Sequence, residues 1–391
     1  MITLTDIRAN KQKTRITAGI LIDNEREEVV TTISDNVAQY VVTDRADAYV
    51  VGLLYFAMIT GHDICSMCPV SEEILWQVNE LLIPSLVRAD KRFHHIHVEA
   101  PVYVAQDDSV PSIVATGISC GVDSLYTILK NKERHYADYA IHYLAYFDVG
   151  AAKTNSTKRD DQQLNAERHE LAVNFCAEYG YPLMEVSSNL VDIISKYHSY
   201  KHVEQVTYMN CMAVLFLANG VSTYYVSSSD PFGDFMLSAE DAQIGDLLLL
   251  QAFSTRSLRF YSIGGETTRV AKTQYISQFD MAHTYLNVCT RSIHNCTTCP
   301  KCVRTITTID GLGQLEKYAD TFDISLYKKN RFLYLRHIWI KCLTIPKDNS
   351  YYAMYKEILD LFKEELTWTF KWKCAIQTII HKVKGTHTPI K

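Results

Sequence analysis

The sequence lacks a hydrophobic run long enough to cross a bilayer, and it lacks the apolar segment of a secretory signal. Its longest apolar run, residues 49–60, falls well short of the roughly 20 residues that a membrane-spanning helix needs. The first residues, Met1–Asp6, are polar and are followed by charged residues rather than by an apolar stretch. We therefore expect a soluble chain in the cytoplasm, with no membrane span.

The sequence also lacks an excess of positive charge. It has 39 Lys and Arg residues against 44 Asp and Glu residues, for a formal net charge of −5. Because nucleic-acid binding requires basic residues that neutralise phosphates, this balance does not favour a nucleic-acid partner, although a local basic groove stays open. The stretch 371–391 is basic and has no acid. It is either a solvated helix end, as charge runs usually are, or a surface for an anionic membrane or another polyanion.

Internal repeats and low-complexity tracts are absent, and the cysteine count does not suit a disulfide framework. The eleven cysteines are an odd number in a chain with no secretory signal, which favours thiols or metal ligands. With 391 residues, 47% of them hydrophobic and 21% charged, the chain is long enough for two or three globular domains.

Strand-like and helix-like patterns alternate from residue 112 onward. Such alternation predicts an α/β fold with a doubly wound parallel sheet, which binds ligands beyond the carboxyl ends of its strands. We predict that this domain covers residues 112–312. Strands are expected at 112–116, 140–147, 182–186 and 223–227, and helices at 162–179 and 203–219.

Two further regions flank this domain. Residues 1–108 predict an α+β N-terminal domain of unknown role, and residues 313–391 predict a helical C-terminal region. The polar, proline-containing stretch 106–111 is a plausible linker. Within the N-terminal domain, strands are expected at 15–22 and 28–33, and helices at 45–59 and 71–87.

The segment Ser119–Ser124 joins the first predicted strand of the α/β domain to a helix. A loop of small residues there leaves backbone N–H groups free to bind an anion, and the helix dipole adds positive charge. Ser119 and Ser124 can donate hydrogen bonds to phosphate oxygens, and Gly121 permits a tight backbone. The alternative is an ordinary turn before a helix. The segment lacks the Gly-Lys-Ser/Thr ending of a Walker loop.

Four cysteines follow at short spacing, in the pattern C-x6-C-x2-C-x2-C. Four thiolates suit tetrahedral Zn²⁺ in a closed structural site, although an iron–sulfur cluster uses the same ligands. A second C-x2-C pair, Cys65 and Cys68, stands alone and predicts no metal site. The four expected zinc ligands are Cys289, Cys296, Cys299 and Cys302.

The loop Ser119–Ser124 resembles the pyrophosphate-binding loop of the N-type, or PP-loop, ATP pyrophosphatases. Their pattern is Ser-Gly-Gly-x-Asp-Ser, and here Cys120 replaces the first glycine. With the cysteine cluster about 170 residues further on, residues 112–313 resemble the 7-cyano-7-deazaguanine synthase family. Two more stretches are similar to that family, namely 146–150 after the second strand and 267–272. The resemblance covers neither the N-terminal block nor the C-terminal helices.

This resemblance implies an adenine nucleotide alpha hydrolase-like fold and an ATP-dependent ligase or synthase. Such an enzyme cuts ATP into AMP and pyrophosphate while it adenylates a carboxylate, which then becomes an amide, nitrile or conjugate. The implied cofactors are ATP and Mg²⁺, beside Zn²⁺, and the implied catalytic residues are Asp123 and Lys272. The implied nucleotide-binding residues are Ser119, Cys120, Gly121, Val122, Asp123, Ser124, Asp148 and Arg269.

The acceptor is expected to be a small-molecule or protein-borne carboxylate, and the chain is compatible with a homodimer. Polar residues near the end of the fourth strand, Ser229, Asp230 and Glu240, are predicted to contact it, although a turn that closes the strand is the simpler alternative. Two other functions stay open. One is a tRNA-modifying thiolase of the same superfamily, and the other is a non-catalytic nucleotide-binding sensor or scaffold.

Overall fold

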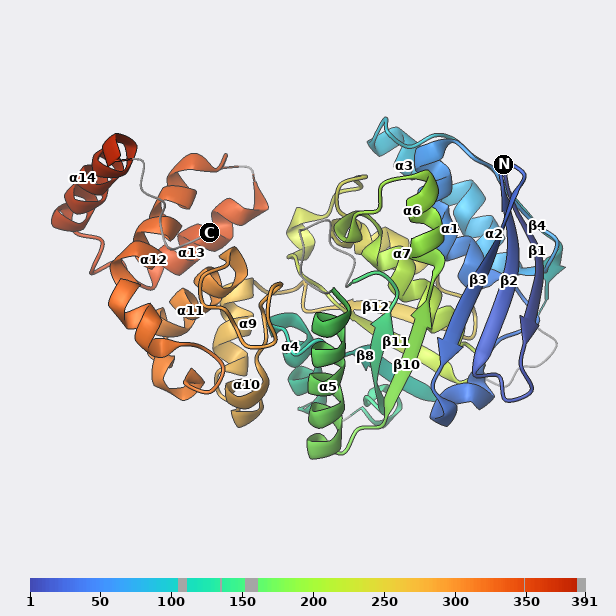
Figure 1. Cartoon of the computed structure of the whole chain (residues 1–391), viewed down its shortest axis with the longest axis horizontal. Coiled ribbons are helices and arrows are strands. Elements are labelled where there is room, and N and C mark those ends of the chain that lie inside the picture. Colours follow the sequence, from blue (N-terminus) through green and yellow to red (C-terminus); the bar gives the residue numbers. More distant parts are fainter. Residues whose placement is uncertain (105–110, 134–135, 152–160, 348, 385–391) are drawn as a thin grey trace. The chain divides into compact units, whose positions relative to one another are not determined.

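A computed structural model of the chain describes residues 1–104, 111–133, 136–151, 161–347 and 349–384 (Figure 1). The chain divides into two compact units. The sheet unit comprises Met1–Ile118 and Lys130–Gly265, and the helical unit comprises Ser119–Leu129 and Glu266–Lys391. None of the helices in the described part of the chain has both the length and the apolar character that a membrane span requires.

The sheet unit is a mixed α/β structure built on a large, mostly parallel sheet of ten strands. Along the sheet, the strand order is β12-β11-β8-β9-β10-β3-β2-β1-β4-β6. The strands are β1 (Ile2–Ala9), β2 (Arg15–Ile22), β3 (Glu25–Ile33), β4 (Ile64–Ser66), β6 (Val98–Glu99), β8 (Ile113–Gly117), β9 (Tyr143–Asp148), β10 (Leu183–Ser188), β11 (Val221–Ser227) and β12 (Arg259–Ile263). The strands β5 (Val70–Ser71) and β7 (Val102–Tyr103) form a separate pair.

The five strands β8, β9, β10, β11 and β12 all run parallel to one another. β8 is central, with β9 and β10 on one side and β11 and β12 on the other. Residues Ile113–Thr116 of β8 are buried, as a strand covered on both faces requires. The predicted strands and helices of this region are confirmed within a few residues. Its helices are α4 (Val122–Lys132), α5 (Asp161–Tyr179), α6 (Leu190–Tyr197), α7 (His202–Leu215) and α8 (Asp246–Ala252).

Strands from the first 108 residues extend the same sheet. β3 pairs antiparallel with β10, where Ile33 lies opposite Val186, and β2 and β1 follow in an antiparallel meander. The turn between β2 and β3 contains Asp23 and Asn24, both with positive φ, as a tight hairpin requires. The predicted strands at 15–22 and 28–33 are therefore confirmed. Of the predicted linker 106–111, only Pro111 lies within the described residues.

The longest apolar run forms a helix that is buried almost all round. This helix, α1 (Asp47–Thr60), packs against α7 (Figure 1). At Gly52, an added Cβ would lie 2.5 Å from the sulfur of Met212, so glycine allows the two helices to approach closely. The predicted helix at 71–87 is α2 (Glu72–Trp76), a π-helical segment (Gln77–Leu82) and α3 (Ile83–Ala89).

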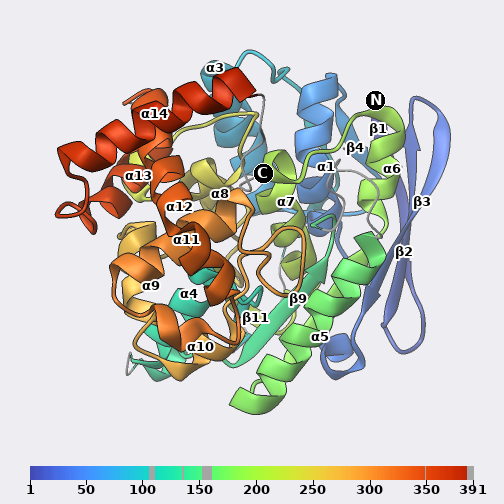
Figure 2. The same ribbon diagram turned by 60° about the vertical axis from the view of Figure 1, so that its left-hand side comes forward.

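The helical unit is built from helices that pack around buried tyrosines. Three of them lie side by side, namely α11 (Pro300–Gly311), α12 (Ile324–Thr344) and α13 (Ser350–Asp360) (Figure 2). The rings of Tyr327 and Tyr334 meet edge to face at 5.0 Å, and the Tyr327 hydroxyl donates to Asp310. The helices that were predicted after residue 313 are present, while further helices of this unit precede that position. The unit also contains α9 (Arg269–Ile276), α10 (Asp280–Tyr285) and α14 (Trp368–Lys384).

Candidate functional site

The predicted anion-binding loop lies between the end of β8 and the start of α4, and its own hydrogen bonds hold it tight. The Ser119 hydroxyl oxygen accepts from the Gly121 N–H at 3.3 Å and lies 3.1 Å from the Ser124 hydroxyl oxygen. The Ser124 hydroxyl also lies 3.2 Å from the Gly121 carbonyl, to which it donates. Two hydroxyls therefore meet at a helix N-terminus, where the backbone N–H groups and the helix dipole favour a bound anion.

Cys120 has a backbone conformation that favours glycine. Its φ angle is +54°, in the left-handed region that glycine enters freely and that other residues rarely adopt. The side chain is 1% exposed, and the carbonyl oxygen accepts a hydrogen bond from the Asn287 N–H at 2.8 Å. Cysteine therefore fits the loop, at the cost of backbone strain that glycine would avoid.

Asp123 forms two ion pairs with residues of one helix. Its Oδ2 lies 3.0 Å from a guanidinium nitrogen of Arg269, and its Oδ1 lies 3.2 Å from Nζ of Lys272. Both cations are on α9, three residues apart, so that they share a face of the helix. The fold thus brings together three of the predicted site residues, although 149 positions separate Asp123 from Lys272 in the sequence.

Lys272 is a buried cation whose charge depends on its neighbours. Its side chain is only 1% exposed. Burial lowers the pKa of the Lys272 ammonium group, and the Asp123 carboxylate opposes this shift. The ammonium also lies 5.9 Å from the centre of the Tyr126 ring, whose hydroxyl donates to Glu266. A buried ammonium group next to a helix N-terminus can bind a phosphate with little competition from water.

A residue of α11 lies near Arg269, and it contacts a residue of α13. Arg304 on α11 lies with its guanidinium carbon 5.8 Å from the centre of the Tyr351 ring on α13. Burial lowers the pKa of Arg304, and the nearby positive charge of Arg269 lowers it further. In the sequence, the one signal for Arg304 is its position just after the cysteine cluster, and no local pattern points to Tyr351.

A second missed contact fixes the start of α9. The Thr268 hydroxyl oxygen caps this helix, since it accepts from the Ala271 N–H at 3.2 Å. The same hydroxyl donates to Glu357 of α13 at 2.7 Å. α13 therefore holds the cap of the helix that carries Arg269 and Lys272. The 89 positions between Thr268 and Glu357 explain why no sequence pattern predicts this contact.

The four predicted metal ligands lie around one point. Their sulfur atoms are all within 4.8 Å of one another. The Cys289–Cys299 and Cys296–Cys302 pairs are 4.0 and 3.9 Å apart. Tetrahedral zinc with bonds of about 2.3 Å requires sulfur–sulfur separations of roughly 3.8 Å, so the four thiols fit a metal such as zinc.

Backbone N–H groups donate to the cysteine sulfurs, as is expected for thiolates. Arg291 donates to Cys289 and Cys299 donates to Cys296, both at 3.3 Å. The buried side chain of Asn295 accepts from the Val288 N–H and donates to two carbonyl groups, which fixes the loop around the cluster. The four thiols could therefore supply every ligand of a tetrahedral metal ion, as in closed structural sites.

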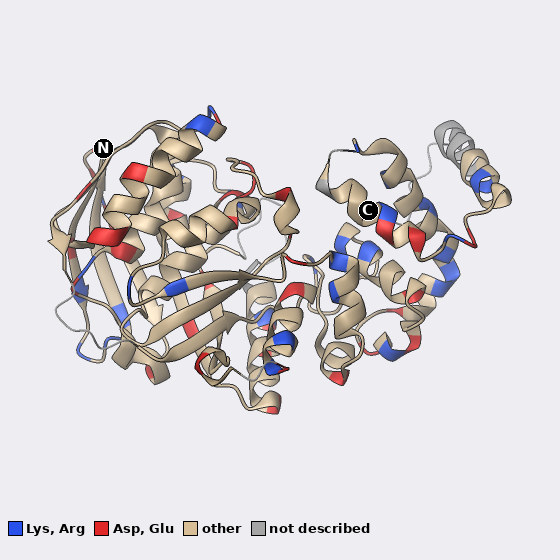
Figure 3. Cartoon of the chain, turned by 180° about the vertical axis from the view of Figure 1, so that it is seen from behind, with Lys and Arg blue, Asp and Glu red and all other residues tan. Residues whose placement is uncertain are grey.

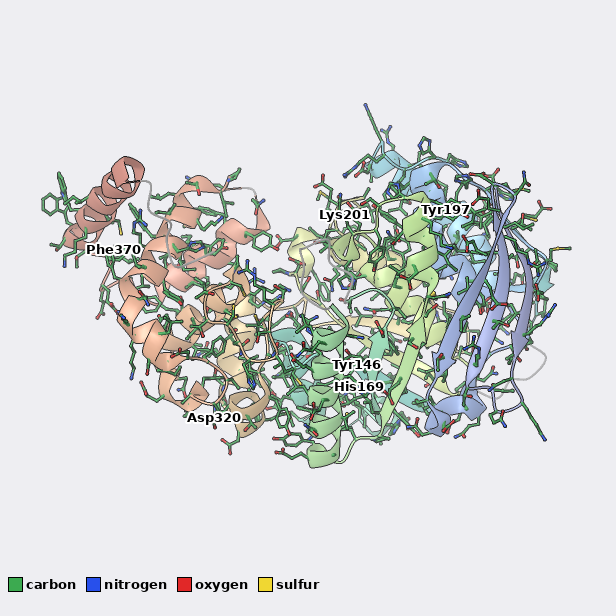
Figure 4. The ribbon with its side chains drawn as sticks, viewed as in Figure 1. Tyr146, His169, Tyr197, Lys201, Asp320 and Phe370 are labelled. Carbon is green, nitrogen blue, oxygen red and sulfur yellow. The ribbon has the colours of Figure 1, made fainter. Side chains whose placement is uncertain are left out.

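Asp148, in the sheet unit, lines a cavity of about 540 Å³. The cavity lies between strands β3, β9 and β10 and helix α5. Tyr146 and His169 face each other there, with ring centres 5.2 Å apart, and His169 pairs with Glu185 (Figure 4). The sequence pointed to Asp148 but not to the aromatic and charged groups beside it.

The predicted substrate residues also belong to the sheet unit. The Ser229 hydroxyl donates to the Asp230 carboxylate, and the exposed Glu240 pairs with Arg92 at 3.0 Å. Asp246, which was not predicted, is 3% exposed and accepts from the Thr207 hydroxyl at 2.6 Å. Burial raises the pKa of Asp246 to about 8, and the carboxylates of Asp241 and Asp230 contribute to this shift. The surroundings of Asp230 are thus acidic.

Comparisons with protein-family models, with curated proteins and with solved structures found no match to the chain. What the protein does must therefore be inferred from the chemistry of its own residues. Two sets of residues offer such chemistry within the helical unit: the cations around Asp123 and the four cysteines.

Proposed function

We propose that the protein is an ATP-dependent adenylating enzyme, similar to 7-cyano-7-deazaguanine synthases. It would convert ATP to AMP and pyrophosphate while it activates a carboxylate of a small molecule or a protein. The product would be an amide, a nitrile or a conjugate. The observation that carries this proposal is the Asp123 carboxylate held between Lys272 and Arg269 at the N-terminal end of α4.

The strand order supports a doubly wound fold of the adenine nucleotide alpha hydrolase type. In such sheets, ligands bind where the strand order reverses, beyond the carboxyl ends of the strands. Here the order reverses beside β8, and the loop Ser119–Ser124 follows that strand in the chain. The domain boundaries at residues 108, 112 and 312 remain predictions.

The loop and the two cations of α9 would bind the pyrophosphate part of the nucleotide. Backbone N–H groups and the hydroxyls of Ser119 and Ser124 would donate to its oxygens. Lys272 and Arg269 would balance the charge that develops on the leaving pyrophosphate, which is the main electrostatic task of such a site. Asp123 serves these cations as their counter-ion.

Mg²⁺ suits the oxygen ligands of Asp123 and of phosphates, and it supplies neutralisation of phosphate charge when it is bound. A phosphate that displaces Asp123 from the two cations would leave the carboxylate available to the metal ion. The roles of Asp148 toward the nucleotide and of Ser229, Asp230 and Glu240 toward the acceptor remain predictions from the sequence.

We further propose that the metal at the four cysteines is zinc and that its role is structural. Asn287, two residues before Cys289, donates to the carbonyl group of Cys120. A metal at the cluster would therefore stabilise the segment around Asn287, which contacts the anion-binding loop. An iron–sulfur cluster uses the same four ligands and is the alternative occupant.

The experiment that tests the proposal measures the nucleotide products. The purified chain is incubated with Mg-ATP, ammonia and a panel of carboxylic acids that includes 7-carboxy-7-deazaguanine. We expect AMP and pyrophosphate to form with at least one acid. We expect Asp123→Ala to reduce this turnover by at least about 100-fold, because the variant loses both the counter-ion and the metal ligand.

The matched control is Asp320→Ala, which removes an exposed carboxylate of the same unit and should leave turnover unchanged. Thermal unfolding and binding of pyrophosphate alone report whether the Asp123→Ala variant is still folded. Full activity in a folded Asp123→Ala variant would refute the assignment of the loop. ATP that binds but stays intact with every acid would favour a nucleotide sensor, for which the strained Cys120 leaves room.

A further inference from the structure

The C-terminal helix α14 has one face that packs on the protein. Phe370 meets the rings of Phe332 and Trp339 of α12 at 5.5 and 6.3 Å. One turn further on, Cys374 is fully buried, and its carbonyl group accepts from Arg336. These contacts fix which side of α14 faces the helical unit and which side faces away from it.

The opposite face of α14 presents large apolar side chains to solvent. Trp368, Trp372 and Ile376 are 73%, 52% and 49% exposed. They are spaced four residues apart and so form one stripe along the helix. At about 100° per residue, Trp372 lies roughly 200° around the axis from Phe370, almost opposite the packed side. The two tryptophan rings also contact each other, with centres 5.3 Å apart.

Lysines flank this exposed stripe on both sides. Lys371 and Lys373 lie about 100° to either side of Trp372 on the helix, and both are exposed. The described part of α14 shows basic and uncharged residues but no acid (Figure 3). The nearest acidic residue in the sequence, Glu365, is paired with Arg331 at 2.6 Å.

The amino-acid sequence repeats this pattern toward the C-terminus. Ile379 and Val383 follow Ile376 at intervals of three and four, and Lys382 and Lys384 stand on either side of Val383 in the sequence. From residue 366 to residue 391 there are five lysines and no Asp or Glu. The sequence after Ile376 thus continues the same combination of apolar and basic residues.

We propose that the exposed stripe of α14 docks on an anionic lipid surface, with the helix lying in the plane of the interface. Tryptophan is the side chain that favours the boundary between lipid headgroups and acyl chains. Lysines beside an apolar stripe extend toward the headgroups and attract anionic lipids. A helix that binds nucleic acid would carry lysines at the centre of its exposed face, whereas the centre of this face is apolar. This proposal is independent of the adenylating activity.

The test is co-sedimentation of the full chain with vesicles of phosphatidylcholine, with and without phosphatidylserine. We expect binding to the anionic vesicles only, and weaker binding at about 0.5 M NaCl, where charges are screened within a few ångströms. Lys371→Gln with Lys373→Gln should weaken the affinity about 25-fold, or roughly fivefold for each lysine near an anionic surface. Trp368→Ser with Trp372→Ser should abolish the binding.

The control variant is Trp76→Ser, because Trp76 is a similarly exposed tryptophan, 57% accessible, in the sheet unit. It should bind vesicles like the unchanged chain. Several outcomes would overturn the proposal: no binding to anionic vesicles, binding that survives the loss of both tryptophans of α14, or an equal loss in Trp76→Ser. A fluorescence quencher reports whether Trp368 and Trp372 are covered. The proposal would also be overturned if a second copy of the chain or a nucleic acid, and not lipid, protected these two tryptophans from the quencher.

Discussion

At the scale of single residues, Cys120 is where side-chain chemistry and backbone geometry conflict. A non-glycine residue in the left-handed region costs about 1 kcal/mol. The buried thiol packs within the loop, but the φ angle of +54° is one that glycine adopts without strain. Substitutions at this position can separate the two effects.

We predict that Cys120→Gly is more stable than Cys120→Ala by about 1 kcal/mol, because both variants lose the sulfur and only glycine relieves the strained backbone. Urea-induced unfolding measures the difference. The same two substitutions at Cys176, a buried residue inside α5, are the control. There the order should reverse, since glycine weakens a helix interior. If Cys120→Ala is as stable toward urea as Cys120→Gly, or more stable, the backbone at Cys120 is not strained.

At the scale of elements, α13 contacts the start of α9 through the hydrogen bond between Glu357 and Thr268. Thr268 is both the cap of α9 and a donor to Glu357. The cations that pair with Asp123 are in the first turn of the capped helix. Loss of the cap contact should therefore affect the anion site as well as stability.

We predict that Glu357→Ala lowers the free energy of unfolding by about 1 kcal/mol, the usual value of such a hydrogen bond. It should also weaken the binding of pyrophosphate, measured by calorimetry, because Arg269 and Lys272 are held less firmly. Glu357→Gln keeps an oxygen acceptor and should retain most of the affinity. Asp360→Ala removes an exposed acid from the same helix and should change neither quantity. Equal affinities in Glu357→Ala and Asp360→Ala would exclude a positioning role for Glu357.

At the scale of the molecule, the cysteine cluster joins the loop that follows α10 to the start of α11. The buried Asn295 connects the loop around the cluster to Leu286 and Thr321, and Asn287 connects it to Cys120. Metal at the cluster is therefore expected to stabilise the helical unit beyond its four ligands.

We predict about one zinc ion per chain by elemental analysis. Its removal with a chelator should lower the melting temperature of the chain by at least about 5 °C, reversibly on addition of zinc. Cys296→Ser should have the same effect. Cys65→Ser with Cys68→Ser should not, because these residues are outside the cluster. A chain without metal that has free cysteines and an unchanged melting temperature would refute the zinc site.

The local patterns of the sequence were sufficient for much of the fold. β8, β9, β10 and β11, with the helices α5 and α7, lie within a few residues of their predicted positions, because hydrophobic periodicity is a property of neighbouring residues. The hydroxyls of the loop and the spacing of the four cysteines could also be recognised in the sequence as features of an anion site and a metal site. Both features depend on residues that are close together in the chain, so a local sequence pattern is enough to predict them.

The tertiary structure alone decided which distant residues meet. Asp123 pairs with cations of α9, Thr268 contacts Glu357, and β3 joins the parallel strands through β10. No periodicity encodes such pairs, since they depend on how buried faces of separate elements pack. The strain at Cys120 belongs to the same group, because a φ angle is imposed by the surrounding structure. The sequence by itself thus determined the elements and the local chemistry, and packing determined the site.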